Sequence, residues 1–251
     1  MTRLLLFVML SGVLFLLLFT SCGGNEQNTN NDATSSDTTT TTSTQTSTTG
    51  TATPSTTVTT PQHMMIAVHR VSNFNRWKAS YDAHDSMRLA NGIHSYVISR
   101  DMTDSNMVQV ATKVDDMAKA KAFAKDPSLK QAMQRGGVTG TPKFQFMTMT
   151  WQDTASVNST IRSFVMMKVK DWNAWRTSFE SGKQERMQNG LIDRAYGHDA
   201  DDSTKVMVVV AVMDTAKARA YWSSDQLKQR RTQGGVIGTP ERRIHQIVQR
   251  Y

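Results

Sequence analysis

Four chemically capable side chains lie along one predicted helix. Trp77, Tyr81, His84 and Arg88 follow one another at spacings of four, three and four residues, which places them on one face of a helix. Aromatic rings can pack against a ligand, an imidazole can transfer protons near neutral pH, and a guanidinium can bind a carboxylate or phosphate. The stripe therefore predicts a site for an anionic or aromatic small molecule.

Each residue of the stripe also has a structural interpretation. Trp77 and Tyr81 can be core residues packed on a sheet, and Arg88 can belong to an ion pair, because an unpaired buried charge costs several kcal/mol. A lone histidine such as His84 is commonly structural. No second histidine or acidic residue accompanies His84 in a metal-binding pattern, so neither a metal site nor a cofactor is predicted.

The stripe occurs twice because the second half of the chain is a copy of the first. Residues 71–142 and 169–240 align at an offset of 98 without a gap, and 27 of the 72 positions are identical. A period of this length indicates a duplicated module. Gly182 stands where the first copy has His84, so only the first copy can use this histidine. The retained pairs are Trp77 with Trp175, Tyr81 with Phe179, and Arg88 with Arg186.

Each copy is predicted to contain strand, helix, strand, strand, helix, strand. Asn73 is expected to cap the first helix and Gly92 to end it. The segment 136–142 is glycine-rich but follows a helix and leads into a strand, so it is interpreted as a connecting turn and not as a phosphate-binding loop. The element order matches the ferredoxin-like pattern. In the first copy the expected strands are 64–71, 94–100, 107–114 and 143–151, and the expected helical stretches are 73–91, 116–125 and 128–135.

A family resemblance rests on a set of short motifs. Trp77-Lys78, His84, Arg88, Gly92-Ile93, the Asp-rich hairpin after Asp101, Asp116 to Ala120, and Gly137-Val138 together resemble the dimeric α/β-barrel superfamily, and its antibiotic biosynthesis monooxygenase-like members in particular. That superfamily pairs two ferredoxin-like modules sheet to sheet. The resemblance implies an α+β fold of two tandem βαββαβ modules, residues 63–153 and 159–251, forming the barrel within one monomeric chain, an intramolecular pseudo-dimer.

Members of this superfamily include cofactor-free oxygenases, haem-degrading enzymes and proteins without known activity. The function expected here is small-molecule binding in the barrel cavity without established catalysis, through Trp77, Tyr81, Arg88, Trp175, Phe179 and Arg186. The alternative is a cofactor-independent monooxygenase acting on an aromatic or polyketide-like substrate, with His84 as the catalytic residue. A further alternative is an envelope structural or interaction protein that uses the basic exterior of its helices.

The N-terminal region predicts export and anchoring. Arg3 precedes an apolar run that ends at Cys22, the chain's only cysteine. Residues 1–22 resemble a bacterial lipoprotein signal peptide, which implies lipidation of Cys22, attachment to the bilayer and a location in the cell envelope. Residues 23–62 are rich in Thr and Ser and are interpreted as a disordered linker.

The formal net charge of +8 favours anionic partners. The basic residues lack the interleaved aromatic residues of a nucleic-acid surface, so no nucleic acid is expected as a partner.

Overall fold

The computed structural model describes residues 56–251. The predicted signal peptide 1–22, the lipidation site Cys22 and most of the linker 23–62 lie outside the described residues. The described residues form one compact unit. The linker prediction is wrong for its last residues, because β1 (Thr57–Val58) pairs with β5 and β2 already begins at Gln62.

The described elements fall into two sets with the same order. The first set comprises β2 (Gln62–Val71), α1 (Phe74–Ala83), α2 (Asp85–Leu89), β3 (Ile93–Asp101), β4 (Met107–Val114), α3 (Met117–Phe123), α4 (Pro127–Arg135) and β5 (Val138–Asp153). The second set comprises β6 (Ile161–Val169), α5 (Trp172–Ser181), α6 (Lys183–Gln188), β7 (Leu191–Asp199), β8 (Lys205–Val212), α7 (Thr215–Trp222), α8 (Asp225–Gln233) and β9 (Val236–Arg250). From α1 onward, each element of the first set has a counterpart that begins 98 residues later. We call the sets the first half and the second half.

The predicted caps of the first helix are confirmed. The Asn73 side chain accepts a hydrogen bond from the backbone N–H of Arg76 at 2.9 Å, and Gly92 has a φ of +65° that favours glycine. The predicted helix 73–91 is interrupted, however, because the backbone of His84 leaves helical geometry between α1 and α2.

The prediction of a connecting turn at 136–142 is wrong from Val138 onward. β5 begins at Val138, and both Val138 and Thr139 pair with the end of β2. The β2–β5 register shifts between Val68 and Arg70, and Gly140 on the opposite strand has a φ of +73°. A glycine at positive φ lets the strand continue through an irregular pairing, so these residues extend the ladder.

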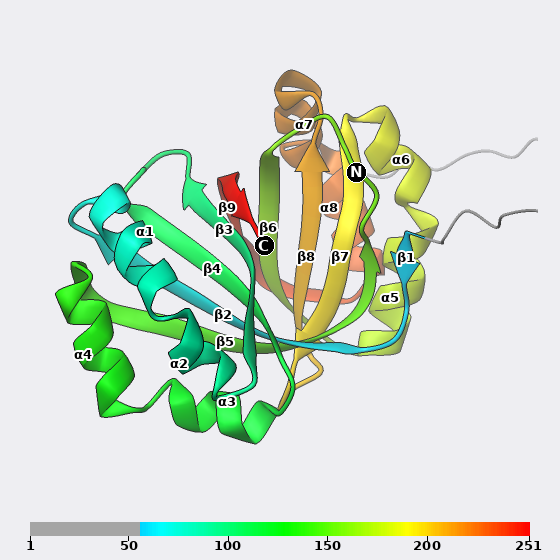
Figure 1. The fold of residues 1–251 in the computed structure, drawn as a ribbon. Helices are drawn as coiled ribbons and strands as arrows, with labels where there is room; N and C mark the ends of the chain where they lie inside the picture. Colours follow the sequence, from blue (N-terminus) through cyan, green and yellow to red (C-terminus); the bar gives the residue numbers. More distant parts are fainter. Residues whose placement is uncertain (1–55) are drawn as a thin grey trace, which may run out of the picture. The chain divides into compact units, whose positions relative to one another are not determined.

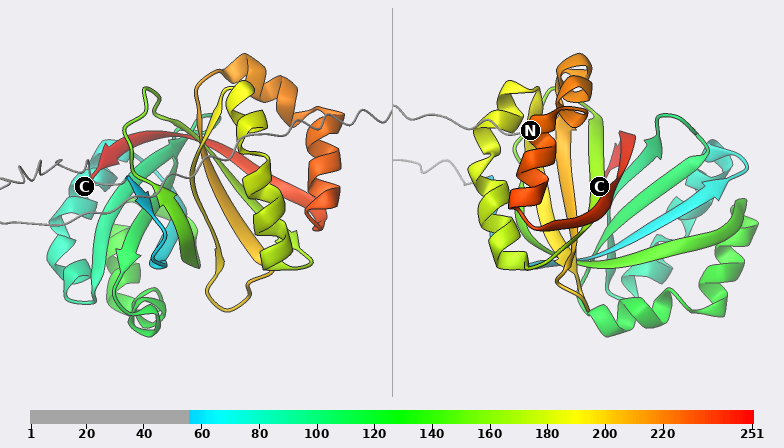
Figure 2. Two further views of the ribbon diagram at one scale, coloured as in Figure 1. Left: turned by 90° about the vertical axis from the view of Figure 1, so that its right-hand side faces the viewer. Right: turned by 180° about the vertical axis from the view of Figure 1, so that it is seen from behind.

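The strands form one closed antiparallel ring. Among the described residues the sheet order is β1-β5-β2-β4-β3-β9-β6-β8-β7, and β5 also pairs with β7. Two seams therefore join the halves: Val97 pairs with Arg250 at the β3–β9 seam, and Gln152 pairs with Ala195 at the β5–β7 seam. The helices of the described part of the chain lie outside the ring, with α1 to α4 on the first half and α5 to α8 on the second (Figures 1 and 2).

Apolar residues are buried in separate layers. Trp77 packs on the outer face of the first half's strands with Val71 and Val108, and Trp175 packs in the corresponding layer of the second half. A methionine-rich cluster of buried residues includes Met64, Met147, Met149 and Met207 from both halves. No helix in the described part of the chain is long and apolar enough to span a bilayer.

The close packing at the β5–β7 seam predicts that one added carbon atom at Gly197 destabilises the fold. A Cβ at Gly197 would lie 2.2 Å from the carbonyl oxygen of Thr148 and 2.6 Å from the Cα of Met149. Gly197→Ala is expected to lower the free energy of unfolding by about 1–3 kcal/mol, or Tm by roughly 2–12 °C, because the strands must separate. Thermal unfolding monitored by circular dichroism measures this.

The matched control is Ser99→Ala at the corresponding position of the other seam. This change adds no atoms and removes only the 3.3 Å contact between Ser99 Oγ and His245 Nδ1, so it is expected to cost about 1 kcal/mol. An unchanged Tm for Gly197→Ala would contradict the seam geometry.

Candidate functional site

The predicted site residues lie in two separate pockets outside the ring of strands. A pocket of about 80 Å³ lies between the helices and the sheet of the first half, and a pocket of about 90 Å³ occupies the corresponding place in the second half. The first is lined by Trp77, Tyr81, His84 and Arg88, and the second by Trp175, Phe179 and Arg186. The prediction of one shared barrel cavity is therefore wrong, because α1 and α5 cover the outer face of the sheet.

Stacked side chains form one wall of the first-half pocket. The rings of Trp77 and Tyr81 are stacked with centroids 5.4 Å apart, and the Arg88 guanidinium lies 3.7 Å from the Tyr81 centroid. On the other side of Trp77, the His69 ring centroid is 5.4 Å from the indole. The four side chains thus form a continuous row from β2 to α2 that combines apolar rings with two polar groups.

The two arginines have different partners. Arg186 Nε and Nη2 donate to the two carboxylate oxygens of Asp193 at 2.7 and 2.6 Å, and both side chains are buried. Arg186 Nη1 donates to the Phe179 carbonyl at 2.7 Å. The ion-pair alternative is therefore confirmed for Arg186, whose fork is fully used within the second half.

Arg88 has no equivalent of Asp193. Ser95 occupies that position, and its hydroxyl contacts the Tyr81 hydroxyl at 2.7 Å. Arg88 Nη2 donates to Asp85 at 2.9 Å and Nη1 to the Tyr81 carbonyl at 2.6 Å, while its buried Nε has no hydrogen-bond partner among the described residues. The first half therefore retains the arginine but leaves one donor free.

His69 is a second polar group without a partner in the same pocket. It is 4 % exposed, and neither ring nitrogen has a hydrogen-bond partner among the described residues. Burial lowers the pKa of His69 to about 4, so the ring is neutral at neutral pH. The sequence predicts a strand over residues 64–71, which contains His69, but it assigns this histidine no role. The available signal was a histidine in an apolar strand where the second copy has Met167.

His84 lies at the junction of α1 and α2 and lines the first-half pocket. Its Nδ1 is 2.6 Å from the carbonyl oxygen of Ser80. A carbonyl only accepts hydrogen bonds, so Nδ1 carries a proton, and in the neutral ring Nε2 has the free lone pair. In the second half, a Cβ at Gly182 would lie 2.9 Å from Arg186 Nη1, so the guanidinium occupies space that a side chain there would need.

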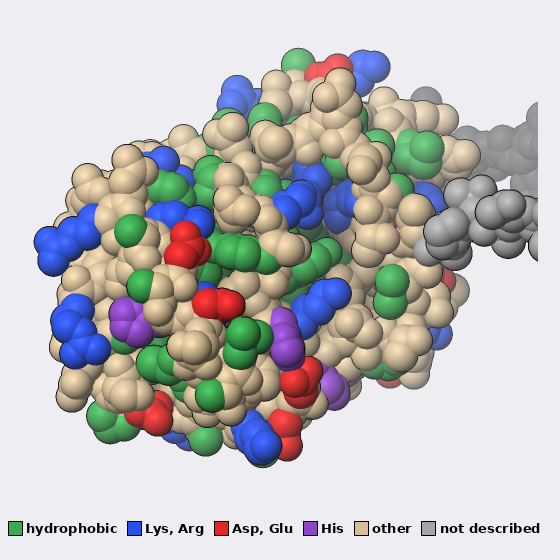
Figure 3. All heavy atoms as spheres, viewed as in Figure 1, with side chains coloured by type: hydrophobic (Ala, Val, Ile, Leu, Met, Phe, Trp, Pro, Cys, Tyr) green, Lys and Arg blue, Asp and Glu red, His purple; other side chains and the backbone are tan. Residues whose placement is uncertain are grey.

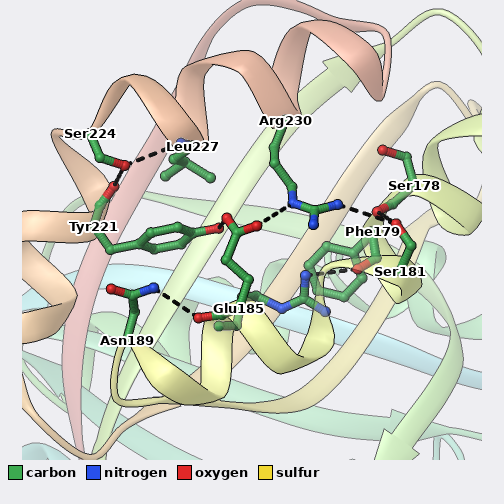
Figure 4. A network of polar contacts seen from close by, with 10 residues as sticks. Ser178, Phe179, Ser181, Glu185, Asn189, Tyr221, Ser224, Leu227 and Arg230 are labelled. Carbon is green, nitrogen blue, oxygen red and sulfur yellow. Dashed lines mark hydrogen bonds and ion pairs between the residues drawn. The ribbon is translucent and has the colours of Figure 1, made fainter. Parts of the chain in front are cut away.

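The second-half pocket contains a polar network instead (Figure 4). Glu185 accepts hydrogen bonds from the Tyr221 hydroxyl and from Arg230 Nε, both at 2.7 Å. Burial opposes ionisation of Glu185, but these bonds and the Arg230 charge keep its pKa below the usual value. The corresponding first-half residues, Met87, Phe123 and Ala132, are apolar. The two pockets have the same position and mostly apolar linings, but only the second half has this carboxylate-centred network beside its pocket.

No three His, Cys, Asp or Glu side chains in the described part of the chain lie close enough together to hold a metal ion. No family model matches the chain. No curated protein matches it either.

Solved structures show what the fold is similar to. An anthrone oxidase-like protein matches with a TM-score of 0.52 at 11% identity, covering 75% of this chain and 92% of its own. A candidate monooxygenase of Fusobacterium nucleatum subsp. nucleatum matches with a TM-score of 0.50 at 13% identity, covering 75% and 93%. A candidate chlorite dismutase gives the same TM-score and identity, covering 75% and 95%. At such identities these matches show similarity of fold alone, an α+β fold with a large antiparallel sheet.

The neutral state of His69 predicts how stability depends on pH. The unfolded chain binds a proton at His69 below the ordinary pKa of 6.5, whereas the folded chain does so only near pH 4. The contribution of neutral His69 to the free energy of unfolding is therefore fully present above pH 6.5. It is lost as the pH falls toward 4, and the loss is on the order of 3 kcal/mol. His69→Met, which copies Met167, is expected to remove this part of the pH dependence.

Urea unfolding at pH 7.5 and 4.5 measures the effect. His94→Gln is the control because His94 is half-exposed and lies outside the pocket. If His69→Met and the parent lose the same free energy of unfolding between pH 7.5 and pH 4.5, the result contradicts the buried, neutral state of His69.

Proposed function

We propose that the first-half pocket binds a small, mostly apolar molecule that carries hydrogen-bonding groups. The observation that carries this proposal is His69, a buried histidine without a hydrogen-bond partner among the residues that the structure describes. Leaving a buried polar group unsatisfied costs about 1–3 kcal/mol, and native structures rarely contain such groups without a reason. A ligand that donates to His69 and accepts from Arg88 Nε would satisfy both groups together.

The divergence of the two halves supports the same site. The two carboxylates that pair with arginines beside the second-half pocket are absent from the first half: Asp193 is replaced by Ser95, and Glu185 by Met87. Conversely, His69 and His84 have no counterpart in the second half. We infer that the second half uses this position for stability, whereas the first half retains it for binding.

The size of the pocket limits the ligand. Its 80 Å³ is about half of the roughly 150 Å³ that holds benzene in a protein core. Met65, Met87 and Met133 line it, and methionine side chains change rotamer readily. An aromatic ring can enter when these side chains move aside, without displacement of the strands.

The second candidate function is a cofactor-independent monooxygenase acting on an aromatic or polyketide-like substrate. The observation that favours it is the tautomer of His84, whose free Nε2 lone pair can accept a proton from an acidic hydroxyl group. Arg88 would hold an anionic group of the substrate beside it. Oxygen uptake with such a substrate, lost in His84→Gly, is the expected result for an enzyme.

We further propose that the chain is a tandem duplication that forms its barrel intramolecularly and acts as a monomer. Two observations support this duplication. The sequence and the bounds of the elements repeat at the same offset of 98 residues, and the two seams pair equivalent strands of the two halves. Lipidation at Cys22 and a location in the cell envelope complete the proposal. Their support is the apolar run before that cysteine.

Native mass spectrometry of the segment 52–251 with haem and a mixed aromatic library tests the binding function. We expect one compound to be retained at one molecule per chain. His69→Met and Ser95→Asp are expected to weaken retention at least tenfold, because the first removes the free acceptor and the second rebuilds the ion pair of the other half.

His94→Gln serves as the control and is expected to retain the compound as the parent does. Absence of any retained compound in correctly folded parent protein would overturn the proposal. Equal retention by the parent, His69→Met and Ser95→Asp would place the bound compound elsewhere and would also overturn it.

A further inference from the structure

A third and larger cavity lies between the two halves. Its volume is about 420 Å³, within the range of about 300–1,000 Å³ that is typical of small-molecule sites. None of the predicted site residues lines it. Residues related by the offset of 98 form its facing walls, among them Ile66 with Phe164, Ala111 with Val209, and Met149 with Ile247.

All three arginines of this cavity come from the second half. Arg162, Arg194 and Arg250 lie on β6, β7 and β9. Their first-half counterparts are Met64, Tyr96 and Gln152, and all three also line the cavity. The walls are thus related in position, but only one of them carries positive charge. Figure 3 shows hydrophobic and Lys or Arg side chains side by side in a hollow near the middle of the face seen in Figure 1.

The charges within the cavity are not balanced. Asp153 is the one acidic residue among those that line it, and Arg194 uses this carboxylate at 3.1 Å. Arg162 Nη1 donates only to the carbonyl oxygens of Ser159 and Ile161, at 2.8 and 2.9 Å. In the part of the chain that the structure describes, no carboxylate pairs with Arg162 or Arg250. Three arginines and one aspartate leave a formal charge of +2.

Arg162 is the most constrained of these cations. It is 3 % exposed, and burial together with the charges of Arg250 and Arg194 lowers the pKa of its guanidinium to about 10. Arg162 is therefore protonated at neutral pH, beside other cations and largely removed from water. Like charges in such surroundings repel strongly, and an anion placed among them would relieve both the repulsion and the loss of hydration.

We propose that this cavity is a second binding site, which takes an organic carboxylate with an apolar body. The carboxylate would contact Arg162 and Arg250, whose planar guanidinium groups match its two oxygens. The apolar body would lie against the methionine and branched aliphatic side chains of the facing wall, such as Met64 and Ile66. This site is independent of the first-half pocket, because the two share no lining residue.

Isothermal titration calorimetry of the segment 52–251 with decanoate, and with decanol as the neutral analogue of the same chain length, tests the proposal. We expect decanoate to bind with a stoichiometry of one and at least tenfold more tightly than decanol. Arg250→Gln is expected to weaken decanoate binding about tenfold or more and to leave decanol binding unchanged. Arg162→Gln is expected to weaken decanoate binding more than Arg250→Gln does. If Arg162→Gln fails to fold, Arg250→Gln still tests the proposal, because the Arg250 side chain is exposed.

Arg219→Gln is the matched control, since Arg219 is an exposed residue of α7 outside the cavity and its replacement removes the same charge. Decanoate binding is expected to be the same in this variant, and in His69→Met, as in the parent. Equal affinities for decanoate and decanol, or equal weakening by Arg250→Gln and Arg219→Gln, would overturn the proposal. Neither result would affect the test of the first-half pocket.

Discussion

The reciprocal pairing of the two halves is the constraint on which the rest of the structure depends. β9 pairs with β3 and β5 pairs with β7, at equivalent registers, so each half supplies an edge that the other requires. Closing the ring leaves no open edge among these eight strands. It also separates inside from outside: residues that point outward meet the helices, and residues that point inward meet the other half. The corresponding pockets of the two halves and the inner cavity follow from this geometry.

Much of the fold could be predicted from the sequence, because periodic apolar residues, the Asn73 cap and the Gly92 stop are local signals. The errors occur where local signals conflict with long-range pairing. Val138 and Thr139 look like a turn beside two glycines, yet they pair with β2. The residues of the helical stripe do share one face of the helix. Their position outside the barrel depends on which face of the sheet each helix covers. Spacing along one helix does not contain that information.

The candidate sites were predictable to different degrees. Trp77, Tyr81, His84 and Arg88 were identified from spacing and do line one pocket. His69, Arg162 and Arg250 were missed, because their significance lies in partners that they lack among the described residues, a hydrogen-bond partner for His69 and a carboxylate for each arginine, which only a structure shows. A comparison of the two halves could have indicated them: Met167 occupies the position that corresponds to His69, and Met64 the position that corresponds to Arg162. In a chain with two similar halves, such unequal pairs distinguish the shared framework from features specific to one half.

The most direct test of the claim that only the first half retains a ligand pocket is NMR of the segment 52–251 with 13C-labelled methionine methyl groups. Met65, Met87 and Met133 line the first-half pocket, and Met167 lines the second. During titration with 1-naphthol, our account predicts saturable shifts of the first three signals and none for Met167. Shifts of Met167 equal to those of the first three, or shifts confined to the exposed Met102 and Met213, would contradict it.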